Sequence, residues 1–185
     1  MSATPLVLLS RLVPAVRAPW AASVAALSLG KALLLLAPAM PLEVFARATA
    51  SVAGMLAGAP VDRVPDGWQL AAVPEPVVVS VACSGTDFWL MLAMLVAWHV
   101  GRLGGAWQRL LAALGGLAAS FLAAIAVNAC RVVAVMQAHR WIIPRWPEAY
   151  GPFLHLLTGV AVFLPALIFC HAFLERRRTR RHTAA

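Results

Sequence analysis

Residues 81–100 read VACSGTDFWLMLAMLVAWHV, and this stretch decides the fold that we expect. Its first seven residues, 81–87, form a polar island that contains a cysteine, two hydroxyl groups, a glycine and a carboxylate. The β-branched run 77–81 leads into the island, and the apolar segment 88–100 leaves it. A helix that enters a membrane through such residues would place reactive groups at the boundary with water.

The composition of the whole chain indicates a membrane protein. Of its 185 residues, 62% are hydrophobic and 12% are charged, whereas soluble domains are about 45–50% apolar and about 25% charged. A soluble fold of this size could not bury so much apolar surface, so we expect lipid to be the solvent. Because a spanning helix needs roughly 20 mostly apolar residues, the length allows four or five spans in one bundle.

We therefore predict an all-α integral membrane protein with a single polytopic domain over residues 1–185. The four predicted spans cover residues 19–40, 84–103, 107–135 and 152–174. Residues 60–82 carry turn and strand signals that predict a small extramembrane β-hairpin. Residues 175–185 are expected to form a basic cytoplasmic tail.

Residues 42–59 are too short and too polar to span a membrane, and we expect an interfacial amphipathic helix there. Its larger apolar residues fall mostly on one side of the helix, with small and polar residues on the other. These larger residues are Val44, Phe45, Val52, Met55 and Leu56.

The net charge of +8 comes from short basic clusters beside apolar segments, not from a basic face. This distribution follows the positive-inside rule and makes nucleic-acid binding an unlikely function. The turn with Arg102 and Arg109 and the tail from Arg176 then belong in the cytoplasm, together with the N-terminus. Spans 84–103 and 152–174 would start outside, and span 107–135 would end outside.

This topology brings polar groups from three helices to one membrane depth. Cys83 precedes one span, Asn128 and Arg131 lie near the outer end of the next, and His155 lies near the outer end of the last. A small-residue stripe on residues 107–135 supports the convergence, because such stripes let helices approach closely. The stripe consists of Gly116, Ser120, Ala124 and Asn128. Asn128 and Arg131 should therefore face neighbouring helices.

A cysteine, an arginine and a histidine at one site are suited to acyl transfer. The cysteine would attack a peptide carbonyl, the arginine would stabilise the oxyanion, and the histidine would move the proton. In sequence order, Ala82-Cys83-Ser84-Gly85, then Asn128-Ala129-Cys130-Arg131, then His155 resemble the hallmarks of the exosortase/archaeosortase family. The resemblance covers roughly residues 54–169, and the short length points to a compact subtype such as exosortase K.

The resemblance implies a membrane-embedded cysteine peptidase or transpeptidase in the bacterial inner membrane, with its site on the periplasmic face. Its substrates would be membrane-anchored proteins with a C-terminal sorting signal: a short motif such as Pro-Glu-Pro, a transmembrane helix and a basic cluster. Cys83 would be the nucleophile, Arg131 the oxyanion or positioning residue and His155 the acid/base. Asn128, Ser84 and Asp87 are candidate supporting residues. The sequence carries no signal for an oligomeric state.

No cofactor or metal is expected. The three cysteines have no zinc spacing, and the five histidines lack the pairing at i and i+4 with a glutamate that a helical metalloprotease uses. One alternative function is an intramembrane serine protease that uses Ser84 with His155, although this reading gives Arg131 no role. A second alternative is a non-enzymatic scaffold or transporter subunit.

Several single residues keep alternative interpretations. Asp87 shares a helical face with Cys83 and would pair with Arg131 or with Lys31, a lysine within the first predicted span. In the alternatives for Cys130, it would itself be the nucleophile in place of Cys83, or it would form a disulfide with Cys83. Cys170 is expected to be structural.

Overall fold

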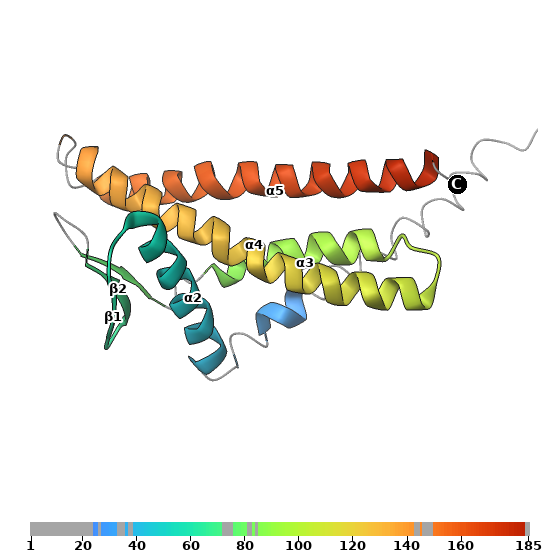
Figure 1. The fold of residues 1–185 in the computed structure, drawn as a ribbon, viewed down its shortest axis with the longest axis horizontal. Helices are drawn as coiled ribbons and strands as arrows, with labels where there is room; N and C mark the ends of the chain where they lie inside the picture. Colours follow the sequence, from blue (N-terminus) through green and yellow to red (C-terminus); the bar gives the residue numbers. More distant parts are fainter. Residues whose placement is uncertain are drawn as a thin grey trace, which may run out of the picture.

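The computed structural model describes residues 24–25, 27–32, 36, 39–71, 76–80, 83, 85–142, 145 and 150–183. Most of the predicted first span, residues 19–40, lies outside the described residues, and the described positions within 24–32 are helical. The elements in chain order are α2 (Ala39–Ala57), β1 (Val61–Val64), β2 (Gly67–Leu70), β3 (Val77–Val79), α3 (Thr86–Val100), α4 (Ala106–Trp141) and α5 (Gly151–Thr183) (Figure 1).

Two long helices, α4 and α5, run along the length of the molecule (Figure 1). They have 36 and 33 residues. Among the described residues, Ala106–Trp141 and Gly151–Arg177 are the stretches long and apolar enough to cross a membrane. The predicted spans 107–135 and 152–174 therefore lie inside longer helices. The predicted tail is not a separate segment, because α5 continues to Thr183.

α3 is shorter than the span predicted over residues 84–103. Its 15 residues measure about 22 Å at 1.5 Å per residue, against a hydrocarbon core of about 30 Å. Gly85, with a φ of 86°, sits in the left-handed region immediately before the helix, and Gly101 follows its last residue. A bundle of four full spans is therefore not confirmed. The described chain is a mostly helical protein with two helices of spanning length and a small sheet.

The small-residue stripe of α4 is a packing face, as the sequence predicts. Ser120 and Ala124 are buried. A Cβ atom at Gly116 would lie 2.5 Å from Cγ1 of Val96 on α3, so only glycine allows the two helices to come this close there.

α2 packs against the C-terminal half of α4, and the face that it buries is mainly the one with small residues. Its small residues Ala46, Thr49, Ala50 and Ala53 are buried. Of the larger apolar residues, Phe45 is buried and Val52 is half-buried, whereas Val44, Met55 and Leu56 are exposed. Close packing on a neighbouring helix selects small side chains. The exposed larger residues remain on the other side.

The predicted hairpin over residues 60–82 is present and carries a third strand. β1, β2 and β3 form an antiparallel sheet in that order. Leu70 and Val79 are buried against α2 and α4 in a cluster that includes Ala129. The sheet lies at the α4–α5 end opposite the C-terminus (Figure 1), and Cys83 follows the last residue of β3 by four positions.

Candidate functional site

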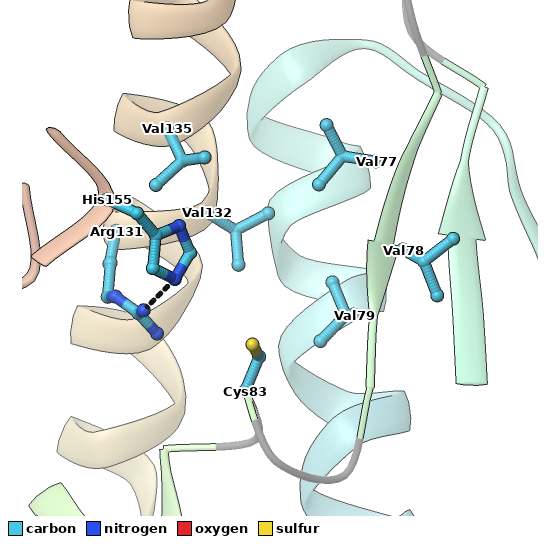
Figure 2. Close-up of a pocket in the computed structure, with 8 residues that line it drawn as sticks. All are labelled: Val77, Val78, Val79, Cys83, Arg131, Val132, Val135 and His155. Carbon is cyan, nitrogen blue, oxygen red and sulfur yellow. Dashed lines mark hydrogen bonds between the residues drawn. The ribbon is translucent and has the colours of Figure 1, made fainter. Parts of the chain in front are cut away.

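A small pocket lies where β3, the Cys83 segment, α4 and α5 meet (Figure 2). Its lining residues are Val77, Val78, Val79, Cys83, Arg131, Val132, Val135 and His155. The structure thus brings Cys83, Arg131 and His155 to one pocket, although they belong to three separate segments. The apolar lining from the valines had no separate signal in the sequence beyond strand and helix propensity.

Cys83 is held by its main chain on both sides of the residue. Its N–H donates to the carbonyl oxygen of Ser80 at 3.0 Å, which turns the chain back after β3. Its carbonyl oxygen accepts a hydrogen bond of 2.8 Å from Nδ2 of Asn128. The thiol is free and the residue is half-buried. Figure 2 shows the sulfur directed into the space between Val79 and the side chains of Arg131 and His155.

Asn128 is fully buried on α4 and acts on the main chain of the Cys83 segment. Because a carbonyl oxygen only accepts, the nitrogen of the amide must face Cys83, which fixes the orientation of the side chain. The same nitrogen lies 3.5 Å from Oγ1 of Thr49 on α2. Asn128 is therefore a positioning residue for Cys83 and does not line the pocket.

Thr49 is a member of this network that the sequence reasoning missed. The available signal was the spacing of small residues along α2, at Ala46, Ala50 and Ala53, which resembles the stripe on α4. Such a stripe indicates a second close helix contact, and a polar residue inside it is a candidate partner for a buried amide.

Gly85 allows the contact between Asn128 and the Cys83 segment. Its φ of 86° is in the left-handed region, where glycine avoids the cost that a Cβ atom imposes. A Cβ at this position would also lie 2.8 Å from Cβ and Cγ of Asn128. Glycine is therefore required twice, by its backbone conformation and by the closeness of α4.

Arg131 and His155 form the polar pair of the pocket. Nη2 of Arg131 lies 2.6 Å from Nε2 of His155. A guanidinium has only donors, so Nε2 accepts and the imidazole is neutral with its proton on Nδ1. On the other side, the guanidinium lies 5.5 Å from the centroid of the Phe163 ring. A Cβ at Gly159 would lie 3.3 Å from Nε of Arg131, so this glycine gives the arginine room against α5.

The positive charge of Arg131 has no carboxylate partner among the described residues. Asp87, one of the expected supporting residues, instead pairs with Lys31. Of the two partners that the sequence allowed, Lys31 is the one observed. The side chain of Asp87 is 72% exposed and lies outside the pocket lining. No carboxylate of the described residues therefore neutralises the cation at the pocket.

The remaining candidate residues do not line the pocket or lie outside the described residues. Ser84 is outside the described residues. Cys130 is exposed with a free thiol, so it is not paired with Cys83. His139 is exposed and does not line the pocket. Cys170 packs against the cluster around Phe88 and Leu92, as expected for a structural residue.

A second polar cluster joins α3 to α5 far along the helices from the pocket. Its members His99, His171 and Glu175 have ligand atoms within 4.8 Å of one another. His171 and Glu175 are four residues apart on α5, a pairing that the sequence reasoning overlooked. An oxygen of Glu175 is 3.2 Å from Nη1 of Arg102 and 3.9 Å from Nδ1 of His99. With an arginine on the carboxylate, the cluster is an ion-pair network between the two helices.

Comparisons of the chain with protein-family models, curated proteins and solved structures found no match.

Proposed function

We propose that this protein is a membrane cysteine peptidase or transpeptidase of exosortase/archaeosortase type, which cleaves C-terminal sorting signals of exported proteins. The observation that carries the proposal is the pocket itself. Among the described residues, a free thiol, a guanidinium that pairs with no carboxylate and a neutral imidazole line one small space. Thiol, cation and imidazole are the nucleophile, oxyanion donor and proton carrier of acyl transfer.

In the proposed reaction, the sulfur of Cys83 attacks the carbonyl carbon of the scissile peptide bond. The C–S bond forms, the thiol proton passes to His155 and the oxyanion accepts a hydrogen bond from Arg131. Collapse of this intermediate breaks the C–N bond, and His155 gives its proton to the leaving amine. Water or an acceptor amine then attacks the thioester, which releases the product and regenerates the thiol. Hydrolysis and transfer share these first steps.

In the proposed reaction, Arg131 exchanges its hydrogen bond to His155 for one to the substrate. In the chain alone, Nη2 donates to Nε2 of His155 and occupies the nitrogen that would receive the proton. A substrate carbonyl that draws the guanidinium toward its oxygen would free Nε2 for the thiol proton. The base would then become available when substrate is present, which limits attack by the thiol in its absence.

The spacing along two helices supports a site at the outer boundary of the membrane. Arg109 and Arg131 are separated by 22 residues of α4, or about 33 Å. His155 and Arg176 are separated by 21 residues of α5, or about 32 Å. Both distances match the thickness of the hydrocarbon core, about 30 Å. We therefore place the basic ends and both termini in the cytoplasm and the pocket at the periplasmic face of the inner membrane.

Thiol labelling in intact cells tests this orientation. The exposed Cys130 should react with a membrane-impermeant maleimide from outside, in a background with Cys83→Ala and Cys170→Ala. A Gly104→Cys variant of the same chain without Cys130 should react only after the cells are permeabilised, because Gly104 belongs to the basic turn and has open space around it. Labelling of both positions from the same side would contradict the placement.

The function is tested with a reporter protein that carries one C-terminal sorting signal: Pro-Glu-Pro, an apolar helix and an arginine cluster. Cys83→Ala should abolish processing when co-expressed with the reporter, and the native protein should form a covalent adduct with it. Cys130→Ala is the matched control and should process normally. Loss of processing in Ser84→Ala together with retention in Cys83→Ala would support the serine alternative. Normal processing in both would support a non-enzymatic role.

A further inference from the structure

β3 forms an open edge of the sheet beside the pocket. It pairs with β2 on one side, where Val77 lies opposite Leu70 and Val79 opposite Trp68. No strand pairs with its other side among the residues that the structure describes. An unpaired strand edge presents main-chain donors and acceptors to any extended chain that reaches it.

The register identifies which main-chain groups face this open edge. On the β1 side, the N–H of Ala71 donates to the carbonyl oxygen of Pro60 at 3.0 Å. Main-chain groups of neighbouring residues alternate between the two sides of a strand. Leu70 therefore directs its groups toward β3, where it exchanges hydrogen bonds with Val77. By the same alternation, the N–H and C=O of Val78 point to the open edge.

The pocket reaches the main chain of β3. It is lined by the consecutive residues 77–79. Figure 2 shows the side chains of Val77 and Val79 directed toward the pocket and that of Val78 directed away from it, so the pocket meets Val78 at its main chain. Val78 is 41% exposed, and by the alternation above it lies opposite Gln69 as a non-hydrogen-bonded pair. Cys83 lines the same pocket, at its end near Val79 (Figure 2).

We propose that an extended segment of the substrate adds to the open edge of β3 as a further strand, pairs its main chain with Val78 and thereby delivers the scissile peptide bond to Cys83. This inference rests on the peptidase function proposed above. Strand addition supplies affinity through main-chain hydrogen bonds, whatever the side chains, and leaves specificity to pockets for alternate side chains. The ligand of this edge is therefore an extended peptide. It lies next to the proposed nucleophile, Cys83, which follows β3 by four residues.

Replacement of one edge donor tests the enzyme side of this proposal. Val78→Pro removes the N–H at the open edge but no bond to β2, a position where a strand tolerates proline. It should lower reporter processing by about 3- to 10-fold, the range expected for one main-chain hydrogen bond. Val78→Thr also changes the side chain but keeps the N–H, so it should process the reporter faster than Val78→Pro. Arg63→Pro is the matched control, because Arg63 faces the opposite edge of the sheet by the same alternation, and it should also process normally.

Two further measurements on these variants distinguish a failure of the strand-addition proposal from a failure of the peptidase proposal. The rate of Cys83 alkylation by iodoacetamide should be equal in the native protein and in Val78→Pro, which shows that the site is intact. Normal processing by Val78→Pro would overturn strand addition while leaving the peptidase function in place. Processing by Cys83→Ala would overturn the peptidase function itself. A change from dimer to monomer in Val78→Pro would instead assign the edge to a second copy of the chain and overturn the proposal.

The substrate side is tested with short synthetic peptides that carry the extended segment of the reporter. Each non-proline amide is methylated in turn, and the peptides compete with reporter cleavage by the detergent-solubilised protein. Paired strands should show a period of two, in which alternate methyl groups weaken inhibition by about 3- to 10-fold and the others have little effect. Equal effects at all positions, or none, would overturn the proposal even if Val78→Pro failed to fold.

Discussion

The side-chain amide of Asn128 donates a hydrogen bond of 2.8 Å to the main-chain carbonyl of Cys83. The bond joins a fully buried position on α4 to the segment that carries the thiol. Because Arg131 lies one helical turn after Asn128, the same stretch of α4 fixes both the nucleophile segment and the cation of the pocket. The relative placement of Cys83 and Arg131 thus depends on one short piece of helix.

Asn128→Ala should destabilise the protein and reduce the activity of the site. The carbonyl of Cys83 would lose its donor, and an unsatisfied buried polar group costs about 1–3 kcal/mol. We expect a lower midpoint of thermal unfolding in detergent together with a partial loss of reporter processing. Ser120→Ala is the control, because Ser120 is buried on the same stripe but bonds only to the carbonyl of Leu117 in its own helix. Equal effects of the two variants would contradict a specific role for Asn128.

Gly85→Ala should be more damaging than an ordinary glycine substitution. The left-handed φ of 86° costs a residue with a Cβ about 1–2 kcal/mol, and the added atom would lie 2.8 Å from Asn128. We expect reduced levels of folded protein and slower alkylation of Cys83. Gly115→Ala, inside α4 with open space around it, should be neutral or slightly stabilising. A neutral Gly85→Ala would mean that the Cys83 segment moves away from α4 without cost.

The sequence predicted the polar residues of the pocket, but not its valines, because the polar residues follow from one-dimensional patterns. Helical spacing placed Asn128 and Arg131 on the face that meets other helices, and charge clusters placed His155 at the same end. Each of these inferences needs only the geometry of a single helix. The structure agrees with them because helix periodicity determines a face even when the identity of the neighbouring helix is unknown.

Long-range pairings could not be predicted in the same way. The sequence allowed either Arg131 or Lys31 as the partner of Asp87, and only the packing of the Lys31 segment against α3 selects the pair. The sequence showed a small side and a larger apolar side on α2, but hydrophobicity alone did not indicate that the small side packs on α4. The open edge of β3 depends on the order of strands in the sheet, for which a three-residue strand carries no sequence signal.

Asp87→Asn should leave reporter processing within about twofold of the native protein. The ion pair with Lys31 is exposed, with side chains 72% and 48% accessible, and such pairs contribute about 0–1 kcal/mol. Removal of either charge should therefore change the unfolding midpoint only slightly. A double-mutant cycle with Lys31→Met measures the coupling. If Asp87→Asn lost processing as severely as Cys83→Ala, Asp87 would have to be counted among the functional residues of the site.

His155→Gln distinguishes proton transfer from support of Arg131. The amide oxygen of glutamine accepts a hydrogen bond close to the position of Nε2, so the guanidinium would keep a partner, but an amide does not carry the proton of the thiol. If His155 is the acid/base, the variant should fold as well as the native protein and lose about 10²- to 10⁴-fold in processing rate. His139→Gln is the matched control, because His139 is exposed outside the pocket, and it should process normally. Retained processing in His155→Gln, with loss in His155→Phe, would assign His155 to holding Arg131 in place and would leave the proton of Cys83 to another group.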